Sequence, residues 1–302
     1  MILKNIAALL RICNTPASII SPFPFFAIAI FLASNNEFNY YGFQNLFIGI
    51  FVSLLSNFAA NLWNHCNDIN EDIAQGKKNI LMQDPSIQKI AIIIAVFLYV
   101  VSFFIVYQLS LEIQRSIYVY FLIWAMATWC YSDTIILKKV TGFRLKEHYI
   151  GEFITYGIAW PMYTLSIWSI YSEITIAGEI IIVAFFFFGI SALLLKDLKD
   201  ISGDRKAGLM TFGVVFSPSK LIRYSCYFMA IYYYIILNPF TLDHFNKGIL
   251  IMIFPFAYFL KNTFFHMYIK NWTLDRGDLE ALKSLGYSAY TSILLLGLST
   301  FF

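Results

Sequence analysis

The stretch that decides this fold reads NHCNDINEDIAQG and covers residues 64–76. It follows a charge-free run, residues 38–63, that is long enough to cross a lipid bilayer. On a helix, the side chains of Asn64, Asp68 and Asp72 lie on one face, because they are spaced four residues apart. Three oxygen-bearing side chains on one face, at the end of an apolar helix, indicate a site for a hard cation.

A second acidic cluster repeats this pattern 132 residues further along the chain, again at the end of an apolar run. Asp197, Asp200 and Asp204 are spaced i, i+3, i+7, which also predicts one helical face. Corresponding positions in the two clusters are Asp68, Asp72 and Gly76, and Asp200, Asp204 and Gly208. The recurrence predicts two acidic clusters that face a common site.

The composition indicates a membrane protein. The chain has 302 residues, of which 59% are hydrophobic and only 13% are charged, whereas soluble domains carry roughly 25% charge. The mean hydropathy of +0.68 agrees with this interpretation. The net charge of +3 is small and no nucleic-acid-binding motif is present, so we expect no nucleic-acid partner. The four cysteines form no CxxC pair and are expected to be reduced core residues.

Apolar runs of about 20 residues predict membrane-crossing helices. We count nine such runs and expect an all-α, polytopic membrane protein with nine transmembrane helices. No linker or low-complexity segment marks a second domain, so residues 1–302 are expected to form a single transmembrane domain. The predicted spans are residues 14–34, 44–64, 89–109, 116–132, 151–171, 177–196, 221–238, 248–267 and 286–302.

The basic residues indicate the orientation of these spans. With a cytoplasmic N-terminus, 19 of the 21 lysines and arginines fall in inner segments, and only Arg115 and Lys247 fall in outer loops. Both acidic clusters then lie on the cytoplasmic side. We therefore expect the active-site loops and the cavity at that face, because loops held by a rigid scaffold carry function.

Basic side chains stand directly beside the acids of the second cluster, with Lys199 before Asp200, and Arg205 and Lys206 after Asp204. Such neighbours make little sense at a bare metal site, but they suit a polyanion that bridges metal ions. The carboxylate and amide oxygens of the two clusters suit two Mg²⁺ ions, which prefer carboxylates together with phosphate oxygens.

A further polar segment, residues 131–139, closes the fourth predicted span on the same inner side. Lys138 has two interpretations: it contacts a phosphate, or it anchors the helix end as an inner positive charge. Tyr131 is either a site residue or part of an interfacial aromatic belt. Glu152, at the start of the fifth predicted span, either orients a lysine, touches an acceptor or forms a structural salt bridge. Glu71 lies off the acidic face and is expected to face solvent.

This combination of motifs resembles the UbiA family of intramembrane prenyltransferases. The family pattern Asn-Asp-x-x-Asp-x-x-x-Asp is similar to the segment that carries Asn64, Asp68 and Asp72, although His65 stands where the family usually has its first aspartate. The second family pattern, Asp-x-x-Asp-x-x-x-Asp, matches Asp197, Asp200 and Asp204. Two further segments also look like the family: Gly203-Asp204-Arg205 with Gly208 and Thr211, and Tyr131-Ser132 with Leu137-Lys138.

The resemblance implies a UbiA-like helical bundle and Mg²⁺-dependent transfer of an isoprenoid chain. The chain would pass from a prenyl diphosphate to a hydrophobic acceptor, which is an aromatic compound, a quinone precursor or a lipid. Asn64, Asp68 and Asp72 would bind one metal ion, and Asp197, Asp200 and Asp204 the other. Lys138, Arg205 and Lys206 would bind the diphosphate, and the ring of Tyr131 would face the allylic cation.

Two other functions compete with this one. An intramembrane terpene cyclase would use the same scaffold, and it would need no acceptor. A secondary transporter would use acids as coupling-ion ligands, but such sites lie near the bilayer midplane on broken helices. The acids here lie at helix ends beside basic residues, which favours prenyl transfer.

Overall fold

The structure is a computed structural model that describes residues 9, 24–34, 38–74, 76, 80–83 and 85–302; within these, the side chains of residues 74, 83, 199, 200 and 276 are not described. The described residues form helices without strands, which confirms the predicted all-α class. Only one isolated backbone bridge, between His148 and Met210, joins the described segments in a β-like manner.

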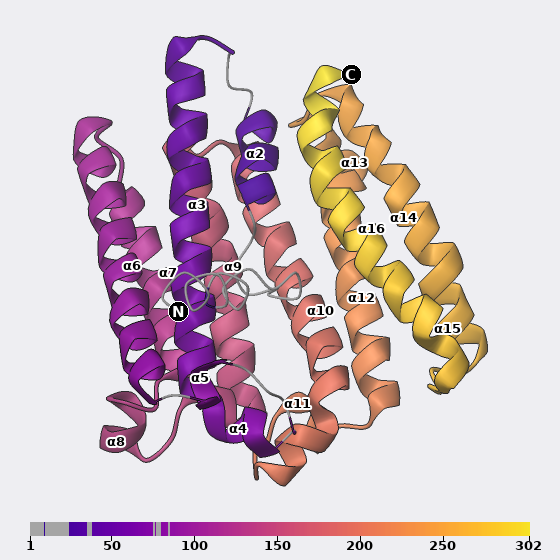
Figure 1. Cartoon of the computed structure of the whole chain (residues 1–302). Helices are drawn as coiled ribbons and strands as arrows, with labels where there is room; N and C mark the ends of the chain where they lie inside the picture. Colours follow the sequence, from indigo (N-terminus) through magenta and orange to yellow (C-terminus); the bar gives the residue numbers. More distant parts are fainter. Residues whose placement is uncertain (1–8, 10–23, 35–37, 75, 77–79, 84) are drawn as a thin grey trace.

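Long helices build the body of the molecule, and short ones lie between them (Figure 1). The long helical segments are α2 (Pro24–Ala33), α3 (Tyr40–Asn67), α6 (Pro85–Glu112), α7 (Ile117–Ser132), α9 (Tyr149–Tyr171), α10 (Ile176–Lys206), α12 (Pro218–Leu237), the run η2 (Lys247–Met252), α14 (Ile253–Phe259), η3 (Leu260–Phe264) and α15 (Phe265–Ile269), and α16 (Leu279–Leu298). The short ones are α4 (Ile69–Ala74), α5 (Ile80–Gln83), α8 (Leu137–Thr141), η1 (Leu145–Glu147), α11 (Phe212–Val215), α13 (Pro239–Leu242), η4 (Arg276–Asp278) and η5 (Ser299–Phe301).

Each predicted span overlaps one of these long segments, although residues 14–23 of the first span lie outside the described residues. Among the described helices, four segments are both long and apolar enough to cross a membrane. These four are Tyr40–Asn67, Pro85–Glu112, Ile176–Leu198 and Lys247–Ile269. The membrane crossing of the remaining spans stays a prediction.

The short helices gather at the two ends of the bundle. Figure 1 shows α4, α5, α8 and α11 at one end and α13 at the other. Between the ends, α10 packs against α9 and α12, while α3 packs against α6 and α2. Aromatic rings fill the interior: Phe185 packs against Phe26 with ring centroids 5.1 Å apart, and Trp160 packs against Phe188 at 5.2 Å. The packed long helices therefore form a rigid support for the end of the bundle that carries α4 and α11.

The sequence predicted that the first acidic cluster lies on one continuous helix, and this prediction was wrong. Helix α3 ends at Asn67, and Asp68 adopts φ −98° and ψ 10° before α4 begins. The amide of Asp72 still donates to the carbonyl of Asp68 at 2.9 Å, so the two acids remain one turn apart. The break lets α4 turn away from the axis of α3.

The two glycines that recur in the acidic clusters have the same structural role. Gly76 follows α4 with φ +72°, and Gly208 follows α10 with φ +73°. This left-handed conformation is open to glycine at no steric cost, and it commonly ends a helix. The recurrence seen in the sequence therefore includes the residues that end both acid-bearing helices.

Candidate active site

The structure brings the helices that carry the two acidic clusters together. Helix α4, which bears Asp72, packs against α10, which bears Asp197 and Asp204. The side chains of these three acids are buried. Asp200 lies on α10 as well, but its side chain lies outside the described part of the structure. Both clusters thus occupy the same end of the bundle (Figure 1).

Asp68 is the centre of the first cluster, and each of its carboxylate oxygens has a cationic partner. Oδ1 accepts a hydrogen bond from Arg144 Nη1 at 3.2 Å, and Oδ2 pairs with the ammonium of Lys146. Asn64 Nδ2 also donates to Oδ2 at 2.8 Å, while Asn64 Oδ1 accepts from Ser132 Oγ at 2.5 Å. The segment that follows α7 therefore reaches the acids that follow α3.

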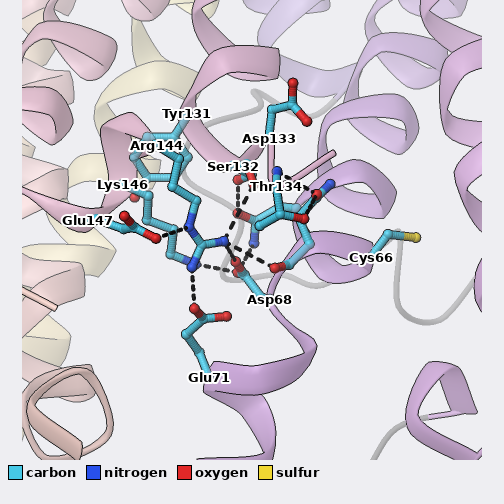
Figure 2. Close-up of polar contacts among 12 residues, drawn as sticks. Cys66, Asp68, Glu71, Tyr131, Ser132, Asp133, Thr134, Arg144, Lys146 and Glu147 are labelled. Carbon is cyan, nitrogen blue, oxygen red and sulfur yellow. Dashed lines mark hydrogen bonds and ion pairs between the residues drawn. The ribbon is translucent and has the colours of Figure 1, made fainter. Parts of the chain in front are cut away.

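Arg144 is fully buried in this cluster, and sequence analysis counted it only as an inner positive charge. Figure 2 shows its guanidinium between Asp68, Glu71 and Glu147, with all three carboxylates directed toward it. Nη1 also donates to the carbonyl oxygens of Asn67 at 3.1 Å and Ser132 at 3.4 Å. Glu71 forms an ion pair with Arg144 and only 12% of its side chain is exposed, so the expectation that it faces solvent was wrong.

The charges around Asp68 keep its carboxyl ionised. Burial alone would raise the pKa of this carboxyl, but the Lys146 ammonium and the Arg144 guanidinium more than offset that effect. The pKa of Asp68 is therefore lowered from its ordinary value. At neutral pH, Asp68 is therefore an anion that can hold a cation.

In the second cluster, the acids bind the segment that follows α10. Asp197 Oδ2 accepts from the amide of Gly213 at 3.4 Å, and its Oδ1 pairs with Lys196 at 3.2 Å. Asp204 Oδ2 accepts from Thr211 Oγ1 at 2.9 Å. These contacts hold the 207–216 segment, including α11, over the end of α10.

Tyr131 lies between the two clusters, with its ring next to two lysines. Lys146 Nζ lies 6.0 Å from the ring centroid and Lys196 Nζ lies 5.8 Å from it. The phenol donates to Glu152 Oε1 at 3.1 Å and accepts from Lys196 at 3.1 Å. Glu152 is fully buried and pairs with Lys196 at 3.4 Å, which fits the interpretation that it orients a lysine.

The comparisons with known proteins agree with this arrangement. The model of the UbiA prenyltransferase family matches residues 22–278. The chain belongs to the UbiA prenyltransferase family. An uncharacterised protein of Archaeoglobus fulgidus is 30% identical over 283 residues, which are 93% of this chain and 94% of that protein.

Three solved structures of UbiA-type proteins share the fold. A UbiA homologue from Archaeoglobus fulgidus bound to DMAPP and Mg²⁺ has a TM-score of 0.65 at 16% identity, with 97% of this chain and 98% of that chain covered. The homologue bound to GPP and Mg²⁺ has a TM-score of 0.66 at 15% identity, with 98% and 100% covered. A structure concerning digeranylgeranylglyceryl phosphate synthase has a TM-score of 0.63 at 16% identity, with 98% and 99% covered. As a UbiA family member, this chain is an integral membrane protein.

The three basic residues expected to bind diphosphate are more exposed than two other lysines at this end of the bundle. Lys138 pairs with Glu147, and 43% of its side-chain surface is exposed. Arg205 and Lys206 are exposed at the end of α10. By contrast, Lys146 and Lys196 lie beside the acids and Tyr131. Lys146 is distant from Asp68 in the sequence and was therefore grouped only with the inner positive charges, whereas Lys196 stands directly before Asp197 in the second acidic cluster.

The donor set at this end suits the metal ions that the UbiA family uses. Five acidic groups, Asp68, Asp72, Glu152, Asp197 and Asp204, are buried there. The cations that pair with them among the described residues are Arg144, Lys146 and Lys196. Carboxylate oxygens are the ligands that a divalent cation such as Mg²⁺ prefers. The described side chains contain no group of three His, Cys, Asp or Glu residues placed to hold a metal ion. The side chain of Asp200 is not among the described side chains.

Proposed function

We propose that this chain transfers an isoprenoid group from a prenyl diphosphate to an acceptor at the cytoplasmic face of the membrane. In this reaction the allylic C–O bond breaks, diphosphate leaves, and the allylic carbon bonds to an acceptor that gives up a proton. The observation that carries the proposal is the meeting of α4 and α10, which places buried acids from both clusters at one end of the bundle. Family membership supports the same reaction class.

The acids of both clusters would hold magnesium together with the diphosphate. A divalent cation bound there would neutralise the charge that develops on the diphosphate as it leaves. Lys138, Arg205 and Lys206 would contact diphosphate oxygens, and the partly buried Lys146 and Lys196 would supply positive charge closer to the acids. The proposed metal ligands are Asn64, Asp68, Asp72, Asp197, Asp200 and Asp204.

Tyr131 would stabilise the allylic cation through its ring. Its side chain is buried, and Glu152 and Lys196 hold its hydroxyl by hydrogen bonds. A ring that is fixed and shielded from water presents its face to a cation without loss of side-chain freedom on binding. The lysines near the ring compete for that face until a diphosphate draws their charge away.

The single domain of residues 1–302, its nine crossings and its cytoplasmic N-terminus remain part of this proposal. Solved UbiA-type structures include complexes with DMAPP and GPP, and one concerns digeranylgeranylglyceryl phosphate synthase. We therefore expect an allylic prenyl diphosphate as the donor, with an aromatic, quinone-type or glycerol-phosphate lipid as the acceptor.

The test measures diphosphate release by the full-length chain in lipid vesicles, with Mg²⁺, a panel of prenyl diphosphates and a panel of aromatic, quinone-type and glycerol-phosphate lipid acceptors. We expect D68A and D200A to abolish Mg²⁺-dependent release. D243A is the control, because Asp243 is exposed at the end of α13, at the other end of the bundle. Release that persists in both cluster variants would refute the assignment. Release without any acceptor, together with a cyclic hydrocarbon product, would instead identify a terpene cyclase.

A further inference from the structure

The two cations that bind Asp68 are held in different ways. Arg144 is fully buried, and its guanidinium contacts three carboxylates and two backbone carbonyls. Moving it would leave those groups without their partner inside the protein, which is strongly unfavourable. Arg144 is therefore a fixed part of the site.

Lys146 is held much less firmly. In the described residues, its ion pair is with one oxygen of one carboxylate, Asp68 Oδ2. Its other neighbour is the Tyr131 ring, 6.0 Å away, and 12% of its side chain is exposed. A lysine carries its charge on a flexible four-carbon stem, so the ammonium can change partners without movement of the backbone.

The carboxylate of Asp68 is divided between these two cations. Figure 2 shows Arg144 and Lys146 at this carboxylate, with Arg144 at Oδ1 and Lys146 at Oδ2. Oδ2 also accepts a hydrogen bond from the amide nitrogen of Asn64 at 2.8 Å. Oδ2 is thus the oxygen whose partners are free to exchange. It also belongs to a residue expected to bind metal, and a bound divalent cation and the lysine ammonium would repel each other at the same oxygen.

We propose that Lys146 is an exchangeable counter-ion of the metal site. It occupies Asp68 Oδ2 while no divalent cation is bound, and it moves to the diphosphate when a divalent cation takes that oxygen. This inference rests on the proposed function, because it assumes that Asp68 belongs to a metal site. The lysine holds the buried carboxylate in place before the substrate arrives, and it then supplies positive charge to the leaving group.

The proposal makes an unusual prediction about affinity: removing a residue of the site tightens metal binding. The measurement is Mn²⁺ binding to the full-length chain in detergent without diphosphate, followed by electron paramagnetic resonance. K146M should bind Mn²⁺ about tenfold more tightly than the wild type, because one competing positive charge is gone. K146R should stay close to the wild type. K139M is the matched control, because Lys139 is an exposed lysine of α8, in the same connection between α7 and α9.

The reverse change is expected for the substrate. A thiolo analogue of geranyl diphosphate, added with Mn²⁺, should bind K146M more weakly than the wild type, since the lysine no longer reaches the diphosphate. If K146M does not fold, K146Q replaces it with the same expected direction of both changes, because its amide carries no charge.

The outcomes separate this inference from the proposed function. Mn²⁺ binding that is equal or weaker in K146M, in a chain whose wild type binds Mn²⁺ and releases diphosphate, overturns the counter-ion role alone. A wild type that neither binds Mn²⁺ nor releases diphosphate overturns both. Tighter metal binding together with weaker analogue binding supports the exchange, since a purely structural lysine would weaken both or neither.

Discussion

The replacement of Arg144 by methionine offers the most direct test of how this end of the bundle is held together. The change removes a fully buried guanidinium that contacts Asp68, Glu71 and Glu147, and it leaves their carboxylates facing one another. Loss of one partner from a buried ion pair costs about 3–5 kcal/mol, because the other charge stays buried without compensation. Solvent does not screen the guanidinium from these carboxylates, because the Arg144 side chain is 0% exposed.

For a chain of 302 residues, with an unfolding entropy of about 2.1 cal/mol/K per residue, about 3–5 kcal/mol corresponds to a fall of roughly 5–8 °C in the midpoint of thermal unfolding. Tryptophan fluorescence of the protein in detergent measures that midpoint. R205M is the control, because Arg205 is exposed. The free energy of unfolding of R205M should differ from that of the wild type by less than about 0.5 kcal/mol, with a correspondingly small change in midpoint. The double variant R144M/E71Q should recover part of the loss, because one of the carboxylates left without a partner is then neutral. An R144M protein that unfolds at the wild-type temperature would refute the reasoning.

Three further predictions address other parts of the molecule. Y131F, which keeps the ring, should retain kcat for diphosphate release within about tenfold, whereas Y131A should lose roughly 30-fold if a desolvated ring contributes about 2 kcal/mol; equal rates for the two variants would exclude a role for the ring. G208A should lower the unfolding midpoint, since a left-handed alanine costs about 1–2 kcal/mol, and G208N should lower it less; an unchanged midpoint in G208A would contradict this. Burial would raise the pKa of Asp278, but Lys270, the amide of Asp275 and His266 lower it to about 2. This depressed pKa stabilises the fold above pH 4, and the contribution disappears as the pH falls through about 2, so wild type and D278N should differ in midpoint at pH 6 and converge toward pH 2.

The fold was predictable in outline because it depends on local patterns. Long apolar runs became helices, and the recurring acids and glycines marked the ends of two of them. The break at Asp68 was not predictable, because the spacing of Asn64, Asp68 and Asp72 fits an unbroken helix equally well. Here the backbone follows tertiary contacts: Arg144 binds both the Asn67 carbonyl and the Asp68 carboxylate at the break.

The candidate site was only partly predictable, for a related reason. The acids can be recognised from their spacing, because the members of each cluster lie close together in the sequence. The basic partners of Asp68 come from a distant segment: Arg144 stands 76 residues and Lys146 78 residues after it. No local pattern links such pairs, so Lys138, which is next to a family-like segment, was favoured over Lys146. In the structure Lys138 pairs with Glu147 instead.

The positive-inside rule does not distinguish these basic partners from other inner lysines and arginines. It treats every inner lysine or arginine as an anchor, and 19 residues satisfy it equally in this sequence. A cation becomes buried only where carboxylates and carbonyls compensate its desolvation. Arg144 meets that condition through Asp68, Glu71 and Glu147, and it is fully buried. Lys146 and Lys196 are partly buried beside Asp68 and Asp197, whereas Arg205 and Lys206 are exposed. Burial of a basic group thus depends on the acids around it, so the site's own cations can be recognised only once the acid-bearing helices have been brought together.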